Sequence, residues 1–335
     1  MPSIRGCASI APPPAMVTES ERLAAALPAI ARKGALRRAL DSDLFYSFRR
    51  SPVTVASAVV TVVLIASALL CGWIAPHNPF DLASLNILDS QNPPAWTSGG
   101  SWDYPLGTDD QGRDVLSAVL YGMRVSIMVG FAAVLLALAA GVSLGLLAGF
   151  AGGWVDTMIM RICDVLLSFP AILIALLIDG IARSLLPHDR QDEIAFYVVV
   201  LAVTVLPAVQ FARTVRGSTL VERNREYVQA ARVIGVHPVA IALRHVLPNV
   251  AGPVLVIATI NLAVAIINEA TLSFLGVGLP LTQPSLGTLI RVGQAYLFSG
   301  EWWMILFPSL ALAGLALAVN LLGDWLRDAL NPKLR

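Results

Sequence analysis

One uncharged segment constrains this chain more than any other feature. Residues 125–155 run for 31 positions without an Asp, Glu, Lys or Arg. As an α-helix this segment is about 46 Å long, more than the ~30 Å hydrocarbon core of a bilayer requires. The whole chain is 56% hydrophobic and 13% charged, about half of the roughly 25% charged share that is usual in soluble domains. This pattern excludes an ordinary soluble enzyme and predicts an integral membrane protein.

Six apolar segments predict an all-α, polytopic membrane protein with six transmembrane helices. Each span is expected to be helical, because a segment in lipid must satisfy its own backbone hydrogen bonds. Gly152 and Gly153 predict a tight turn between the second and third spans, and Trp302 and Trp303 predict an interfacial anchor at the start of the sixth. The spans are expected at 53–75, 125–155, 157–178, 194–212, about 250–272 and 302–323.

The positions of the basic residues predict the orientation of the chain. Loops on the cytoplasmic side of a membrane are enriched in Lys and Arg. With a cytoplasmic N-terminus, eighteen basic residues lie inside and five outside, so both termini are expected in the cytoplasm. The predicted regions are a cytoplasmic N-terminal arm at 1–52, the first transmembrane helix at 53–75, an outer loop at 76–123, a five-helix core at 124–323 with an inner loop at 223–249, and a cytoplasmic tail at 324–335.

The inner loop between the fourth and fifth spans has the pattern of two short helices joined by a turn. Residues 226–234 predict the first helix, and Gly235 is expected as its left-handed C-terminal cap. Pro238 stands where a second helix would begin. The small residues Ala230 and Ala231 allow another backbone to approach closely. The loop is therefore predicted to be a compact docking element.

Three groups of residues resemble the permeases of binding-protein-dependent ABC importers. The inner-loop run 229–248, QAA-x3-G-x9-H-x-LP, resembles their EAA loop, with Gln229 and His245 where the generic pattern has Glu and Ile. The run 106–114 (LGTDDQGRD), followed by YG-x-R-x-S at 121–126, resembles the outer-loop signature of the dipeptide, oligopeptide and nickel group. The runs EA-x-LSFLG at 269–276 and NLLGD-x-LRD at 320–328 resemble that group's fifth span and C-terminus.

The resemblance implies a type I ABC importer transmembrane subunit in the inner (plasma) membrane of a bacterium, with the outer loop in the periplasm. Its partners would be a homologous second permease subunit, two cytoplasmic ATPase subunits and an extracytoplasmic peptide-binding protein. A short helix around 232–239 would sit in a groove of an ATPase and transmit its movement. The residues assigned to this coupling loop are Glu226, Gln229, Ala230, Ala231, Arg232, Gly235, His237, His245, Leu247 and Pro248.

No sequence pattern predicts catalysis by this chain itself. A phosphate-binding loop requires G-x4-G-K-[ST], and neither of the two lysines, Lys33 and Lys333, has that context. ATP and Mg²⁺ are therefore expected on the partner ATPases, and no cofactor and no catalytic residue are assigned here. The four His and three Cys residues are scattered and predict no metal site. A net charge of +1 argues against nucleic-acid binding.

The outer run at 106–114 has a structural and a functional interpretation. Asp109 is expected to form an Asx turn, and Asp114 is expected to cap the helix that leads into the second span. The alternative is contact with a soluble substrate-binding protein, for which the candidates are Asp109, Asp110, Arg113 and Asp114.

Polar residues within the spans are candidates for lining a translocation path. An ionisable group in a membrane is costly unless it faces protein or a water-filled cavity, which marks Glu269; hydrogen bonding to the backbone of the 276–278 loop is the alternative. Asp164 is expected to pair with Arg161 on the same helix, with a role as substrate ligand as the alternative. Three glycines, at 141, 145 and 149, predict close helix packing. The path candidates are Glu269, Asn268, Asn261 and Asp164.

The cargo implied by the resemblance is a di- or oligopeptide. Ala118 and Leu286 depart from the group, which commonly has Arg and Trp there; both are expected in outer loops, where they bear on the cargo. Nickel or another small solute is the alternative, because these permeases share their motifs. An ion-coupled secondary transporter is a rival of another class. It would show inverted repeats with broken helices around a midplane site, and no such pair is visible in the sequence.

Overall fold

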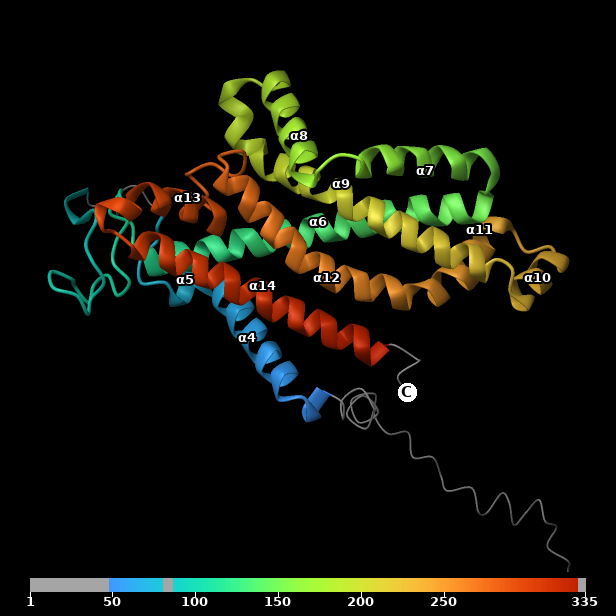
Figure 1. Cartoon of the computed structure of the whole chain (residues 1–335), viewed down its shortest axis with the longest axis horizontal. Helices are drawn as coiled ribbons and strands as arrows, with labels where there is room; N and C mark the ends of the chain where they lie inside the picture. The colour runs from blue at the N-terminus through green and yellow to red at the C-terminus, as the bar shows by residue number, and fades with distance from the viewer. Residues whose placement is uncertain (1–47, 81–86, 331–335) are drawn as a thin grey trace, which may run out of the picture. The chain divides into compact units, whose positions relative to one another are not determined.

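The computed structural model describes residues 48–80 and 87–330 (Figure 1). Most of the predicted arm at 1–52, and the end of the predicted tail at 331–335, lie outside the described residues. Met1–Arg50 forms one unit, of which a short helical piece at 48–50 is described, and Ser51–Arg335 forms a second unit. Within the described residues every regular element is helical, which confirms the predicted fold class.

Five helices of the second unit are long and apolar enough to cross a membrane. The π-helix η2 (Ala242–Val246) connects the short helix α11 (Pro238–Ile241) to α12 without a break, so that one candidate span runs from Pro238 to Phe274. The long helices are α4 (Pro52–Leu69), α6 (Val115–Ala151), α9 (His188–Glu222), α12 (Leu247–Phe274) and α14 (Trp303–Leu330).

The predicted third span is not one straight helix. It consists of α7 (Gly153–Leu167) and α8 (Ala171–Leu185), which are bent by 96° relative to each other. Pro170 explains the break, because proline lacks a backbone N–H and disfavours helical geometry in the residue before it. The described residues thus contain five candidate spans, or six if this bent pair is one span. A broken helix is therefore present, although no second such pair occurs among the described helices.

Helix α6 packs closely against α9 through three glycines, as predicted. A Cβ atom added at Gly141 would lie 2.4 Å from the Cβ of Phe211, and one at Gly145 would lie 2.5 Å from the carbonyl oxygen of Ala212. At Gly149 the nearest atom of α9 would be 2.7 Å away. Only glycine permits this separation, because real Cβ contacts are never so short. The tight turn predicted after α6 is also present, with positive φ at the two glycines that follow it.

Helix α6 begins earlier than the predicted loop boundary at residue 123. Asp114 is its N-cap, and its carboxylate accepts a hydrogen bond from the backbone N–H of Ser117 (2.9 Å), as the sequence predicts. Ala118 therefore lies in α6, and Leu286 begins α13 (Leu286–Tyr296); both side chains are buried. The expectation of an outer loop is wrong for Ala118, because the Asp114 cap begins the candidate span α6 before it; Leu286 lies in the connection between the candidate spans α12 and α14.

The short elements gather at the two ends of the long helices (Figure 1). Helix α10 (Glu226–Val233) and α11 lie at one end, called here the hairpin end. Helix α13 and the loop at 87–114 lie at the opposite end, called here the outer-loop end. The remaining short elements are α5 (Cys71–Ile74), η1 (Ile87–Asp89) and η3 (Leu297–Ser299).

Candidate functional site

The predicted coupling loop folds as a hairpin of α10 and α11. Gly235 follows α10 with φ +82°, which confirms the predicted left-handed cap. Its N–H and that of Val236 donate hydrogen bonds to the carbonyl oxygens of Arg232 and Ala231, each at 3.0 Å. This pair of bonds is the Schellman motif, which satisfies the last carbonyl groups of a helix. The expected single helix around 232–239 is therefore wrong: α10 ends at Val233, residues 234–237 form the turn and α11 begins at Pro238.

The second helix of the hairpin has its own cap. His237 is the N-cap of α11, and its Nδ1 accepts a hydrogen bond from the backbone N–H of Val239 (3.3 Å). Pro238 follows in the first turn, where its missing N–H costs nothing. Both ends of the turn are thus closed by local hydrogen bonds, which makes the hairpin a defined element.

The tip of the hairpin presents apolar side chains to the outside. Val233 is 87% exposed, Ile234 78% and Val239 57%. By contrast, Val228 and Ala231 face inward and are buried, so Ala231 is not available to a partner. The other predicted coupling residues that are exposed are Glu226, Gln229, Ala230, Arg232, Gly235, His237 and Pro248.

The base of the hairpin joins it to the long helix α12. His245 lies in the π-helix η2 and is partly buried, as is Leu247 at the start of α12. Asn249 donates hydrogen bonds to the carbonyl oxygen of His245 (2.7 Å) and to the hydroxyl of Tyr227 on α10 (3.1 Å). Because π-helical turns often occur at functional positions, this junction is a natural place for the hairpin to act on α12.

An apolar groove of about 660 Å³ lies beside the hairpin. Its walls are the end of α6, including Leu147 and Phe150, and the segment from Pro238 to Leu247. The guanidinium of Arg232 stands 5.5 Å from the ring centre of Phe150. The second helix of the hairpin is therefore separated from the end of α6 by this groove.

Two ion pairs hold α7 against α9. Arg216 binds both carboxylate oxygens of Asp156 through Nε and Nη2, with 2.7 Å between Nη2 and Oδ2. Asp164 pairs with Arg213. The expected pair of Asp164 with Arg161 is therefore wrong, because α9 places a guanidinium closer to this carboxylate than the next turn of its own helix does. The side chain of Asp164 is exposed, but it takes part in the contact between α7 and α9.

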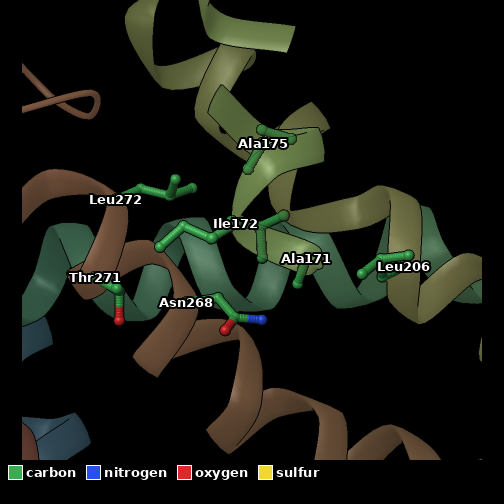
Figure 2. A pocket seen from close by; sticks show the side chains of 9 residues that line it. Ala171, Ile172, Ala175, Leu206, Asn268, Thr271 and Leu272 are labelled. Atoms are coloured by element: carbon green, nitrogen blue, oxygen red, sulfur yellow. The ribbon is translucent and has the colours of Figure 1, made fainter. Parts of the chain in front are cut away.

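A cavity of about 80 Å³ opens between α8, α9 and α12 (Figure 2). Asn268 and Thr271 are the polar residues of its lining, which includes Ile172 and Ala175 of α8. The amide of Asn268 makes no hydrogen bond to any other described residue, whereas Thr271 donates to the carbonyl of Ile267 (2.7 Å). Asn268 is thus the predicted path residue whose side chain is free to form hydrogen bonds with a molecule bound in this cavity.

Two other path candidates are enclosed by protein. Asn261 is 4% exposed and donates to the carbonyl oxygen of Ile257 (3.0 Å). Glu269 is 0% exposed and accepts hydrogen bonds from the hydroxyls of Ser126 and Ser273, each at 2.7 Å. The expected alternative for Glu269, bonding to the 276–278 backbone, is wrong, because the serine hydroxyls occupy both carboxylate oxygens. Neither side chain reaches a cavity in this conformation.

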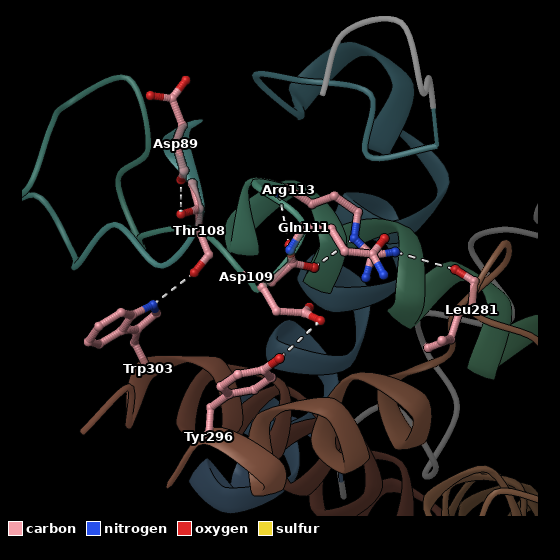
Figure 3. Close-up of polar contacts among 9 residues, drawn as sticks. Asp89, Thr108, Asp109, Gln111, Arg113, Leu281, Tyr296 and Trp303 are labelled. Carbon is pink, nitrogen blue, oxygen red and sulfur yellow. Dashed lines mark hydrogen bonds and ion pairs between the residues drawn. The ribbon is translucent and has the colours of Figure 1, made fainter. Parts of the chain in front are cut away.

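The outer-loop residues form a buried polar cluster (Figure 3). One carboxylate oxygen of Asp109 accepts from the N–H groups of Gln111 and Arg113 (2.9 Å each), which confirms the predicted Asx turn. The other pairs with Arg113 Nε at 2.6 Å, and Arg113 Nη1 donates to the carbonyl oxygen of Leu281 (3.3 Å). Asp109, Arg113 and Asp114 are at most 5% exposed, so these side chains stabilise the loop.

Asp110 is only partly buried, unlike its neighbour Asp109. The hydroxyl of Tyr296 donates to its carboxylate at 3.4 Å. Burial, and secondarily the charge of Asp109, raise the pKa of Asp110 above its usual value. The same carboxylate is the main reason why the pKa of Tyr296 is raised. The ionised carboxylate of Asp110 is therefore unfavourable in this part of the cluster.

Trp303 belongs to the same cluster. Its Nε1 donates to the carbonyl oxygen of Thr108 (3.0 Å), and its side chain is 7% exposed. The predicted role of Trp303 as an interfacial anchor is therefore wrong, because the outer loop folds over it; Trp302 remains 37% exposed. Thr108 and Ser126 are also buried polar partners, and no spacing signal in the sequence relates them to residues so far along the chain. Among the described residues no group of His, Cys, Asp or Glu is placed to hold a metal ion.

Two family models match this chain. The model described as "Binding-protein-dependent transport system inner membrane component" matches residues 141–335, and the model described as "N-terminal TM domain of oligopeptide transport permease C" matches residues 42–94. The first covers the hairpin, the Asn268 cavity and Glu269.

Curated relatives match most of the chain. The dipeptide transport system permease protein DppC of Haemophilus influenzae is 34% identical over 293 residues, covering 88% of this chain and 95% of the relative. The glutathione transport system permease protein GsiD of Pectobacterium atrosepticum is 38% identical over 296 residues, covering 88% and 91%. A solved structure of the MetNI methionine ABC transporter in an inward-facing conformation is 21% identical, with a TM-score of 0.49, and covers 65% of this chain and 96% of that chain.

Proposed function

This chain belongs to the family of binding-protein-dependent transport system inner membrane components, and we propose that the cargo it passes into the bacterial cytoplasm is a di- or oligopeptide. It is a multi-pass protein of the inner membrane and a permease component of an ABC transporter. The peptide assignment is supported by its relatives, whose names specify dipeptide and glutathione transport. Nickel or another small solute is the competing cargo.

The hairpin of α10 and α11 is proposed to dock into a cytoplasmic ATPase subunit. The observation that carries this proposal is the exposed apolar tip formed by Val233, Ile234 and Val239. In water such a cluster is unfavourable unless a partner covers it. The same hairpin continues through η2 into α12, so a force applied at the tip acts directly on a membrane helix.

The complete transporter is proposed to contain a homologous second permease, two ATPase subunits and an extracytoplasmic peptide-binding protein, in a type I importer arrangement. The hairpin end then lies in the cytoplasm together with both termini, as the distribution of basic residues predicts. ATP and Mg²⁺ bind to the ATPase subunits, and this chain supplies the path. The Asn268 amide is proposed to line that path, since an amide can both donate to and accept from peptide groups.

Two experiments test the proposed function. The first is affinity purification of the tagged chain from native membranes in mild detergent, with mass spectrometry of the proteins that accompany it. A second permease and ATPase subunits are expected; a folded chain that purifies alone contradicts the proposal and favours an ion-coupled transporter.

The second experiment identifies the cargo. Uptake of radiolabelled dipeptide, tetrapeptide, glutathione and nickel is compared in cells with and without the gene. ATP-dependent uptake of a peptide, abolished by the deletion and restored by the gene, is the expected result. Restored nickel uptake without peptide uptake would overturn the cargo assignment while leaving the ABC permease role intact.

A further inference from the structure

Glu269 is the most completely buried acidic side chain of the described residues, and it forms no ion pair there. It lies one turn before the end of α12, with 0% of its surface exposed. Its Oε2 accepts from Ser126 of α6 and its Oε1 from Ser273 of α12, both at 2.7 Å. The hydroxyl of Ser285, the N-cap of α13, faces the same carboxyl group. Two helices, α6 and α12, thus donate hydroxyl hydrogen bonds to one acid, beside the N-cap of a third.

The donors around Glu269 form a directed relay. The backbone N–H of Leu286, the first residue of α13, donates to Ser126 Oγ (3.3 Å), and Ser126 in turn donates to Glu269. A carboxylate is an acceptor with two oxygens and about four lone-pair sites. It can therefore receive several hydroxyls at once, which neither an apolar nor a purely donating side chain can do.

Close backbone contacts surround this relay. A Cβ at Gly278 would lie 2.2 Å from Ser273 Oγ, and one at Gly287 would lie 2.2 Å from the carbonyl oxygen of Ala270. The loop after α12 and the first turn of α13 are consequently seated directly on α12. At this contact α13 cannot slide past α12 without breaking the bond from Leu286 N–H to Ser126 Oγ, the hydroxyl that donates to Glu269.

The opposite end of α12 carries the hairpin. The helical segment from Pro238 to Phe274 has 37 residues, which corresponds to about 55 Å at 1.5 Å per residue. Gly235 and His237 close the turn at one end of this rod, and Glu269 lies close to the other. A displacement of the hairpin therefore moves the outer-loop end only if α13 is fixed to α12.

We infer that Glu269 is a positioning residue that clamps α13 to the ends of α6 and α12, so that the hairpin and the outer-loop end move as one body. This inference rests on the proposed function, in which an ATPase drives the hairpin and a binding protein docks at the outer-loop end. Glu269 itself touches neither cargo nor ATPase. Its role is to ensure that a movement at the hairpin end of α12 also moves the outer-loop end.

The test compares Glu269→Ala and Glu269→Gln in the purified complex with its partners in lipid nanodiscs. ATP hydrolysis is measured without and with peptide-loaded binding protein. Glu269→Ala is expected to leave the basal rate intact and to reduce the stimulation by roughly 5-fold or more, the lower end of ordinary coupling between two sites. Glu269→Gln, which keeps an acceptor oxygen, is expected to restore most of the stimulation. Full stimulation in Glu269→Ala would overturn the inference.

A second pair of variants guards against misfolding. Ser126→Ala removes one donor from the clamp, whereas Ser143→Ala removes an exposed hydroxyl of the same helix that bonds to the carbonyl of Ala139 (2.7 Å). Reduced stimulation in Ser126→Ala but not in Ser143→Ala supports the clamp. Equal behaviour of the two serine variants counts against it, whatever the fate of Glu269→Ala.

A distance measurement separates this inference from the proposed function. Spin labels are placed at Gln294 of α13 and Leu135 of α6, both exposed, in the chain without its partners. The wild-type distance distribution is expected to be narrow and that of Glu269→Ala broad. If no ATPase accompanies the chain, the proposed function fails and this readout is unaffected; equally narrow distributions overturn the clamp alone.

Discussion

Trp303 Nε1 donates a hydrogen bond to the carbonyl oxygen of Thr108 across 3.0 Å, joining residues 195 positions apart. The bond connects the first residue of α14 to the loop that precedes α6. The hydroxyl of Thr108 donates to the carbonyl oxygen of Asp89 (2.5 Å) and accepts from the N–H of Asn92 (2.8 Å). The outer loop is therefore organised around Thr108, and the indole is one of its attachments, beside the bonds of Arg113 to Leu281 and of Tyr296 to Asp110.

Replacing Trp303 tests this attachment. Trp303→Phe keeps most of the buried ring and loses the donor, so we expect a destabilisation of about 1–3 kcal/mol from the unpaired carbonyl group. Trp302→Phe, at an exposed neighbour, is the control and should change little. The measurement is thermal unfolding of the two purified variants, monitored through the loss of their monodisperse peak. Equal midpoints for both variants would show that the bond does not anchor the loop.

Gly235 is predicted to be intolerant of a β-branched residue. At φ +82° an L side chain is strained by roughly 1–2 kcal/mol, and Gly235→Val should therefore disorder the turn that is proposed to dock to the ATPase. We expect normal amounts of the chain in the membrane, weaker co-purification of the ATPase and loss of uptake. Gly217→Val is the matched control, since Gly217 is helical and a Cβ there meets nothing within 4 Å. Normal uptake by Gly235→Val would contradict the docking role of the hairpin.

The His237 cap offers a finer test of the same element. His237→Ala removes the acceptor for the N–H of Val239 and is expected to cost about 1 kcal/mol, whereas His237→Asn retains a capping oxygen and should cost less. The ATPase affinity of the purified permease, measured by titration, should follow the order wild type, Asn, Ala. If Asn and Ala bind equally weakly, the imidazole contacts the ATPase itself and the cap is incidental.

Asp110 makes the stability of the outer-loop end depend on pH. Its pKa is raised in the folded protein, first by burial and then by Asp109, so the folded state binds this proton more tightly than the unfolded state does. The folded state consequently loses stability as pH rises from the usual value near 3.8 through the raised one. Asp110→Asn should therefore stabilise the protein at neutral pH, and its advantage should vanish on acidification.

The measurement for Asp110 is the difference in unfolding midpoint between variant and wild type at several pH values. Asp103→Asn, an exposed acid of the same loop, supplies the background. A difference that does not change with pH would show that the charge of Asp110 is not what destabilises the loop.

Asn268 is predicted to contribute to cargo recognition. Asn268→Leu fills a similar volume and removes the amide, so the KM for peptide uptake should rise by roughly tenfold, the equivalent of one lost hydrogen bond of about 1.4 kcal/mol. Val264→Leu, at an exposed apolar position of the same helix, is the control. An unchanged KM in transport assays would place the path elsewhere.

Local patterns along the chain predicted the long helices and two of the helix caps. The uncharged run at 125–155, the Asp114 cap and the Gly235 turn are governed by interactions within a few residues, and each was found where expected. The break of the third span was not anticipated, although Pro170 is its cause, because its flanking segments are apolar enough to read as one continuous helix.

The partners of buried polar groups depended on packing between distant helices. Asp164 pairs with Arg213 instead of Arg161. Glu269 accepts hydrogen bonds from hydroxyl groups on two helices that are more than a hundred residues apart in sequence. Spacing within one helix carries no information about which neighbouring helix faces it. Hydrophobicity and helix capping can therefore be predicted from the sequence alone. The hydrogen-bond partners of buried polar groups are decided only when helices such as α6, α12 and α13 pack together and water is excluded from between them.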